Sequence, residues 1–346
     1  LAVSGGKLSG PIEVVKEDVD QVELRIEGFV FYDDKSASLA TIPIQSNNGN
    51  GDILHRGLRI EIKKTITDFS ATIHLEDKGD DGSGTKKPVS AFLFFKIVFP
   101  KDYDSYKSLT IETNPIPGEQ LDIFIPKALE IEFTNLDIHA TSGKIQIKDT
   151  IITENLKTYS YQNTFIHEVK PARGDRITIS SSTVSEKLHI NVLTGPVGGH
   201  ETEINRVIVG SKTGEVAVKI RSDKDTKPGP NARLAPIDVS ANTVSGAINL
   251  DIAPADESQA VLVYARSVTG VVQSTLSDDY SGSIDLTSDN AEVDLIPKED
   301  SKSVIEFDEK SSYHIQATKY LSSSTEIGDG SITLFSKRGD AKVTFV

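Results

Sequence analysis

The feature of this sequence that most constrains its fold is a period-two alternation of apolar and polar residues along much of the chain. Clear examples are the runs Val22–Ile26, Leu58–Ile62, Leu129–Phe133 and Val216–Ile220. Such runs are rich in Ile, Val, Thr and Phe, and Gly, Asn, Asp and Ser separate them. Because helical periodicity is almost absent, the pattern predicts strands with one buried face, and we expect an all-β protein.

A short phrase recurs from about residue 138 onward, in which small polar residues lead to a glycine and then to an alternating strand. Six copies contain the glycines Gly143, Gly214, Gly246, Gly270, Gly282 and Gly330. The third, fourth and fifth of these are 24 and 12 residues apart, close to one rung and half a rung of a β-solenoid, and the phrase at Gly282 returns 48 residues later. Glycine permits a tight corner and close approach between rungs, so the six are predicted corner glycines. An antiparallel meander with glycine in its hairpins is the alternative.

The two parts of the chain differ in phenylalanine content and in the loops between their strands. At roughly 150 residues per domain, 346 residues suggest two domains or one repetitive array. Nine of the 13 phenylalanines lie at or before Phe133, where long polar loops separate the strands. We therefore expect a Phe-rich sandwich-like or capping β domain with an aromatic core over residues 1–130, and a repetitive β-solenoid-like domain over residues 131–346.

The recurring phrase resembles that of the "putative adhesin" family, repetitive β-solenoid-like proteins of bacteria and fungi. The residues that carry the resemblance are Thr141–Ile145, Thr243–Ile248, Val268–Val272, Ser281–Ile284 and Asp329–Ile332. It covers roughly residues 131–346 and implies a right-handed β-helix-like domain associated with cell envelopes or secretion. The family brings no catalytic motif to transfer. Long insertions and the Phe-rich first third depart from its pattern.

Charge and composition exclude several partners. The chain has 37 Lys and Arg against 51 Asp and Glu, a formal net charge of −14, and its basic residues form no cluster, so we expect neither nucleic acid nor anionic membrane as a partner. The longest apolar run, Ala91–Phe99, is interrupted by Lys96 and is too short to span a membrane. Cys, Met and Trp are all absent. Without oxidisable sulfur the chain suits an extracellular or cell-surface location.

Catalytic and metal motifs are weak in this sequence. It contains neither a nucleophile elbow nor a histidine pair at metal-binding spacing, so we expect no catalytic residues, no cofactor and no enzyme activity. Calcium is the one ion with a candidate site, at Asp77, Asp80 and Asp81 in a Gly-rich stretch that fails the EF-hand pattern. A flexible, solvated loop is the alternative interpretation. Further acidic groups lie at Asp278–Asp279 and at Asp289, Glu292 and Asp294.

Three functions are compatible with this pattern. The first is a non-enzymatic secreted or surface structural protein of adhesin type, which self-associates through unpaired end strands such as Ala341–Val346. The second is a carbohydrate-binding module for surface glycans, with Tyr103, Tyr106, Tyr159 and Tyr161 as stacking candidates. The third is a β-helix enzyme that degrades polysaccharides with paired carboxylates. Two Arg-Gly-Asp triplets, at residues 173–175 and 338–340, are interpreted as coincidence, because the second occupies a repeat corner.

Overall fold

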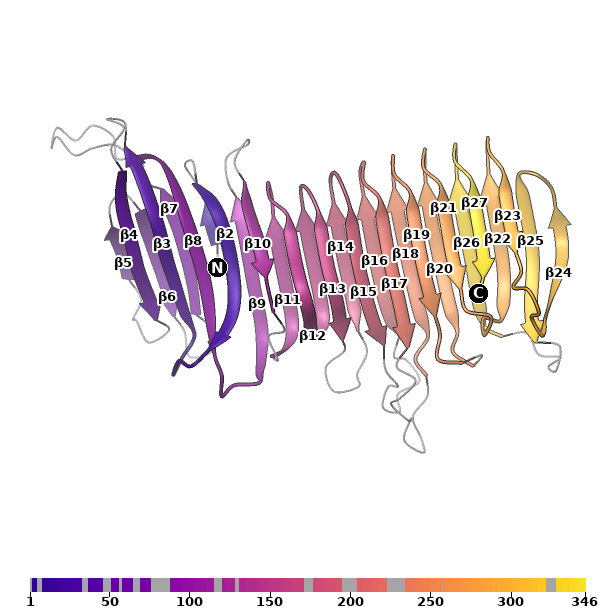
Figure 1. Cartoon of the computed structure of the whole chain (residues 1–346), viewed down its shortest axis with the longest axis horizontal. Coiled ribbons are helices and arrows are strands. Elements are labelled where there is room, and N and C mark those ends of the chain that lie inside the picture. The colour runs from indigo at the N-terminus through magenta and orange to yellow at the C-terminus, as the bar shows by residue number, and fades with distance from the viewer. Residues whose placement is uncertain are drawn as a thin grey trace. The chain divides into compact units, whose positions relative to one another are not determined.

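The computed structural model describes residues 2–4, 8–32, 37–45, 51–55, 58–64, 69–75, 88–114, 120–127, 131–170, 177–194, 204–222, 234–256, 258–321 and 328–346. Every regular element in these residues is a β-strand, so the all-β prediction is confirmed (Figure 1). The chain divides into two compact units. Unit 1 is Leu1–Ile131, Asp137–Thr150 and Tyr159–Asn163, and unit 2 is Glu132–Leu136, Ile151–Thr158 and Thr164–Val346.

Unit 2 is built of two sheets of parallel strands, which the chain visits alternately, in agreement with the predicted solenoid-like fold (Figure 1). In spatial order, the first sheet contains β14 (Thr178–Thr183), β16 (Asn205–Ser211), β18 (Ile237–Thr243), β20 (Val261–Ser267), β26 (Gly330–Ser336) and β22 (Gly282–Ser288). The second contains β13 (Thr164–Lys170), β15 (Leu188–Thr194), β17 (Val216–Ser222), β19 (Ile248–Ala253), β21 (Val272–Leu276), β27 (Ala341–Phe345) and β23 (Val293–Ile296).

The core of unit 2 follows directly from the period-two alternation. In β18, for example, Ile237, Val239 and Ala241 are buried and the residues between them face outward. Parallel pairing in unbroken register repeats this arrangement on the next strand, so Val239 lies beside Val263 on β20. Each buried Ile, Val or Leu contributes about 1.5–3 kcal/mol relative to an exposed side chain. Rows of stacked aliphatic residues therefore stabilise the unit without any disulfide.

The rungs of unit 2 do not follow one another in chain order. Strand β26 pairs with β20 on one side and β22 on the other, and β27 lies in the same way between β21 and β23. The last rung of the chain is thus inserted between two earlier ones, with Gly330 in register with Gly282. The expected exposed edge at Ala341–Val346 is wrong, because neighbours on both sides already occupy the hydrogen-bonding edges of this strand.

An antiparallel hairpin closes the first sheet of unit 2. Strand β25 (His314–Leu321) pairs with β22, and β24 (Ser303–Lys310) pairs with β25. Strand β24 is largely exposed, carries the charged run Asp308, Glu309 and Lys310, and has a register shift between Phe307 and Glu309. Charges and irregular register on an outer strand oppose pairing with another chain. This edge is therefore poorly suited to strand-by-strand assembly.

Unit 1 combines parallel and antiparallel strands. One row runs, in spatial order, through β4 (Ala37–Gln45), β3 (Glu23–Tyr32), β8 (Pro88–Pro100), β2 (Leu8–Glu17), β10 (Leu121–Ile125) and the start of β12 (Ile145–Ser160). A second row runs through β5 (Gly51–His55), β6 (Leu58–Lys64), β7 (Phe69–Leu75), β1 (Ala2–Ser4) and β9 (Ser105–Asn114). Strands β11 (Glu132–Ala140) and β12 contribute to both units.

The buried face of the first row in unit 1 is mainly aliphatic. Ile12, Ile26, Val30 and Leu93 are fully buried there, together with Phe95. The expected aromatic core is thus formed by only some of the phenylalanines, because others on β3 and β8 face the solvent. Those outward side chains define the candidate site.

Candidate functional site: an exposed aromatic face

Four phenylalanines lie on the outer face of adjacent antiparallel strands in unit 1. Phe29 and Phe31 on β3 are 49% and 39% exposed, and Phe92 and Phe94 on β8 are 41% and 51% exposed. Alternation places them outward because Val30, Leu93 and Phe95 occupy the inward positions of the same strands. Phe29 and Phe92 are register partners across the two strands. We call these four residues the aromatic face.

The aromatic face is a contiguous apolar surface. The rings of Phe92 and Phe94 meet edge to face, with centroids 5.3 Å apart and planes at 86°. Directly opposed residues on antiparallel strands are close enough for their side chains to touch, which joins Phe29 to Phe92. A phenylalanine presents 150–250 Å² when fully open, so the four expose roughly 350 Å² together. A patch of this size is comparable to the largest apolar patch on a typical monomeric protein, and such patches are often functional.

A charged network lies at the other end of the same outer face. Arg25 and Lys96 are register partners on β3 and β8. Arg25 donates to Glu17 at 2.7 Å and to Glu23 at 2.8 Å, and Lys96 also donates to Glu17. The hydrogen bond from Lys96, with help from Arg25 and against the effect of burial, holds the pKa of Glu17 below its usual value. The two cations are therefore engaged by carboxylates.

One described neighbour of the aromatic face is an exposed carboxylate. Exposed Glu27 on β3 is the register partner of Phe94, one step from Phe29 along the same side of the strand. Arg25 and Lys96 are engaged as described, so among the described side chains beside the rings the charge without an ion pair is the Glu27 carboxylate. Anionic ligands are disfavoured at such a surface, whereas a neutral ligand with apolar and hydroxyl-bearing parts is accepted.

The four tyrosines that the sequence predicts to stack on sugars differ from one another in exposure. Tyr106 packs edge to face on Phe99 with centroids 4.8 Å apart, and burial raises the pKa of Tyr106 to about 12. Tyr103 is 56% exposed beside it, with ring centroids 6.5 Å apart. Tyr159 lies against His139, whereas Tyr161 is 50% exposed. One member of each pair faces solvent. The sequence does not single out the phenylalanines of the aromatic face, because a phenylalanine in a strand pattern is expected in the core.

The calcium candidates Asp77, Asp80 and Asp81 lie outside the described residues. Among the residues that the structure does describe, no group of three or more His, Asp or Glu side chains could hold a metal ion. Asp294 forms an ion pair with Lys342 at 3.7 Å. Of the two Arg-Gly-Asp triplets, residues 173–175 lie outside the described ranges, and Gly339 of the second lies in the connection between β26 and β27.

The glycines singled out from the sequence occupy two kinds of position. Gly214, Gly246 and Gly270 lie in the four-residue connections between the two strands of a rung, and Gly143 lies in the corresponding connection between β11 and β12. A Cβ on Gly246 would lie 2.0 Å from the carbonyl oxygen of Gly214 on the preceding rung. Gly282 and Gly330 instead begin strands β22 and β26 and face each other in register. At both kinds of position the neighbouring backbone leaves no space for a side chain.

A buried hydroxyl accompanies each of several corners in unit 2. Ser267 accepts a hydrogen bond from the N–H of Gly270 at 2.8 Å and donates to the carbonyl of Gly246 at 3.1 Å. Ser336 makes the same two contacts one rung further on, with Gly339 and Gly270, each at 2.9 Å. Each hydroxyl thus accepts a hydrogen bond from the N–H of its own corner glycine and donates one to the carbonyl of the preceding corner glycine. The local signal is a Ser or Thr three residues before the corner glycine.

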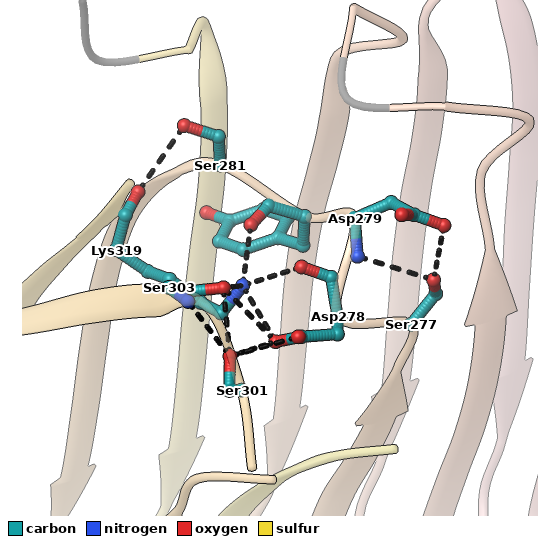
Figure 2. A network of polar contacts seen from close by, with 8 residues as sticks. Ser277, Asp278, Asp279, Ser281, Ser301, Ser303 and Lys319 are labelled. Atoms are coloured by element: carbon teal, nitrogen blue, oxygen red, sulfur yellow. Dashed lines mark hydrogen bonds and ion pairs between the residues drawn. The ribbon is translucent and has the colours of Figure 1, made fainter. Parts of the chain in front are cut away.

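A second cluster surrounds Lys319, a buried charged residue that is 1% exposed (Figure 2). Its Nζ donates to the backbone carbonyls of Asp278 at 2.6 Å and Tyr280 at 3.0 Å and to Ser303 Oγ at 2.8 Å, and it lies 3.1 Å from Asp278 Oδ1. Ser301 also donates to the Asp278 carboxylate at 2.8 Å. Lys319 comes from β25, Ser303 begins β24, and Asp278 and Tyr280 lie in the connection between β21 and β22. The cluster therefore fastens the β24–β25 hairpin to the connection between β21 and β22.

The electrostatics of this cluster favour a fixed ion pair. Burial lowers the pKa of Lys319, while Asp278 opposes that change. Burial raises the pKa of Asp278, but hydrogen bonds from Ser301, Lys319 and Ser303 together outweigh it and leave the pKa below its usual value. Four oxygen atoms around a single ammonium group stabilise its charged form, so both groups are ionised at neutral pH. The arrangement can hold a hairpin in place, and a protonated Lys319 is no base for Ser303.

The geometry of the described residues thus defines an all-β protein with a stacked, largely parallel solenoid-like unit and a separate exposed aromatic face. No protein-family model matches the chain, and a comparison with curated proteins finds no match. A solved structure of a "putative cell adhesion protein" from Clostridium sporogenes ATCC 15579 aligns with 100% of this chain and 92% of its own, at 8% identity and a TM-score of 0.17. A TM-score this low carries no inference. Within the described residues, no helix has the length and hydropathy needed to cross a membrane.

Proposed function

We propose that the protein is a non-enzymatic, adhesin-like binding protein, extracellular or displayed on a cell surface, whose aromatic face attaches it to neutral polysaccharide. The observation that carries this proposal is the group of four outward phenylalanines in unit 1. Sugar rings have apolar C–H faces that pack on aromatic rings, and their hydroxyls are satisfied by neighbouring polar groups and water.

Charge supports a neutral ligand over other occupants. The chain has a net charge of −14, and Glu27 lies beside the rings. Nucleic acid and anionic lipid surfaces both require exposed Lys or Arg, which the aromatic face does not provide. A second copy of the chain would bring two acidic surfaces together. A neutral polysaccharide needs no exposed Lys or Arg and is not repelled by the acidic surface.

Self-association, the other expectation from the sequence, receives less support. The outer strand β24 carries charges and an irregular register, and β27 is enclosed between two neighbours. Assembly through β27 would first require one of its two neighbours to be displaced, and the charges and register shift of β24 oppose pairing at its outer edge. We therefore propose attachment, with the protein acting as a discrete particle.

Co-sedimentation with insoluble neutral polysaccharides such as cellulose, chitin and mannan tests the proposal. The double variant Phe29→Ser, Phe92→Ser removes the centre of the aromatic face, and Phe307→Ser removes an exposed ring from β24 as the matched control. We expect the unmodified protein to bind at least one of these polymers, the double variant to bind at least tenfold less, and the control to bind normally. Equal binding by all three proteins, or no binding to any polymer, would overturn the proposal. Binding only to lipid vesicles would reassign the face to a membrane.

A further inference from the structure

The outer surface of the second sheet in unit 2 carries a row of side chains that begins with two stacked rings. Phe165 on β13 and His189 on β15 are register partners, with centroids 5.2 Å apart and planes inclined by only 18°. The next position in the row is Ala217 on β17. The stack therefore stops where a methyl group replaces a ring, and the far face of the His189 ring has no aromatic neighbour in the row.

A depression of about 280 Å³ occupies the space above Ala217. Its lining includes His189, Ala217, Lys219, Asn249, Asp251 and Gln273. Ligand sites for drug-sized molecules begin at about 300 Å³, so this volume suits a single ring better than a chain of several. The open face of His189 forms one wall of this space.

Polar groups line the opposite wall in a fixed arrangement. Gln273 Nε2 donates to Asn249 Oδ1 at 2.6 Å, and Asn249 Nδ2 donates to Glu215 at 2.7 Å. Among the described residues no group donates to the side-chain carbonyl of Gln273, which remains available as an acceptor. Lys219 and Asp251 form an ion pair at 2.8 Å, which places a donor and an acceptor side by side with no net charge.

We propose that this depression is a binding site for one neutral sugar ring, which stacks on His189 and continues the row of rings over Ala217. Burial lowers the pKa of His189, so the platform is an uncharged imidazole at neutral pH. The ring hydroxyls, each both donor and acceptor, match Gln273 and the Lys219–Asp251 pair. This site is separate from the aromatic face and does not depend on it.

Titration of the whole protein with neutral methyl glycosides, followed by NMR of the Ala217 methyl and His189 ring signals, tests the site. We expect weak, saturable shifts with at least one glycoside. The variant Ala217→Phe fills the depression with the ring that the row lacks, and should weaken binding at least tenfold. As a matched control, Thr333→Phe adds a ring beside Tyr264 on the first sheet, away from the depression, and should bind normally.

Several results would overturn this assignment. Absence of shifts with every glycoside, or unchanged binding by Ala217→Phe with its fold intact, would show that the depression is not a sugar site. Shifts produced by indole and by no glycoside would show that the ligand is an aromatic compound. The Phe29→Ser, Phe92→Ser variant should retain these shifts, so failure of the aromatic face and failure of this site are distinguishable.

Discussion

The ammonium group of Lys319 lies 3.1 Å from Oδ1 of Asp278 although the lysine side chain is almost entirely buried. Replacing Lys319 with Met keeps the apolar stem, removes the counter-charge of the Asp278 carboxylate and takes one donor from each of two backbone carbonyls. Removing one partner of a buried ion pair costs about 3 kcal/mol, and we expect Lys319→Met to lower the free energy of unfolding by that amount. Chemical denaturation measures the change. Lys302→Met, at an exposed position, should change stability by less than about 0.5 kcal/mol. Equal effects of the two variants would show that the cluster around Lys319 does not hold the hairpin in place.

Acid should weaken the same contact. The pKa of Asp278 is lower in the folded protein than its ordinary value of 3.8, so its stabilising contribution is fully present above that pH and is lost as the pH falls through the lower folded value. We expect the stability of the unmodified protein to decline below pH 4 more steeply than that of Asp278→Asn. Melting temperatures between pH 2 and 6 measure this difference. Parallel curves for the two proteins would show that Asp278 does not contribute to acid sensitivity.

Two glycines in unit 2 offer a matched pair of substitutions. A Cβ at Gly246 would lie 2.0 Å from a backbone oxygen, whereas one at Gly210 would have its nearest contact at 3.4 Å, with Asn242. Gly246→Ala must therefore shift a neighbouring rung and should destabilise unit 2 by about 3 kcal/mol or more. Gly210→Ala should be neutral or slightly stabilising, because alanine restricts the unfolded chain. Thermal unfolding of both variants checks the prediction, and similar melting temperatures would refute the close stacking of corners.

The buried hydroxyl of Ser267 should stabilise unit 2 through its two hydrogen bonds. Ser267→Ala leaves the N–H of Gly270 and the carbonyl of Gly246 without partners, at a cost of about 1–3 kcal/mol. Ser267→Thr should retain most of the stability, because Thr243 occupies the register-equivalent position on β18. Urea denaturation of the two variants distinguishes loss of the hydroxyl from a change of volume. A Thr variant as unstable as the Ala variant would mean that packing alone matters at this corner.

The fold class was predictable because alternation and corner glycines are local signals. The position of β26 and β27 was less accessible, since it depends on pairing between residues far apart in the sequence. The similarity between the phrases at Gly282 and Gly330 did indicate that these strands are related, and the structure shows that they are direct neighbours. Similarity alone does not state whether two copies touch or are separated by other rungs.

The aromatic face was not predictable for a different reason. In the run Ala91–Phe99, both the inward and the outward positions of the strand are apolar, so alternation cannot say which side is buried. Lys319 presents the opposite case. It follows Ile315 and Ala317 at period two, which places it on the inward side, whereas a lysine charge is typical of an outward position. Only the pairing of β25 with β22, together with the oxygens around Nζ, resolves that conflict.

The insertion of the last rung also affects the order in which the protein can form. A nascent chain emerges from its N-terminal side, so β22 and β23 are synthesised before the strands that separate them from β20 and β21. Winding one rung onto the previous one can therefore proceed only as far as β21. Beyond that point, β22 and β23 either stay unpaired with the earlier rungs or pair with β20 and β21 and must later be displaced. Insertion of β26 and β27 is then the final step of folding. Because its contacts join residues far apart in the sequence, we expect this step to be slow.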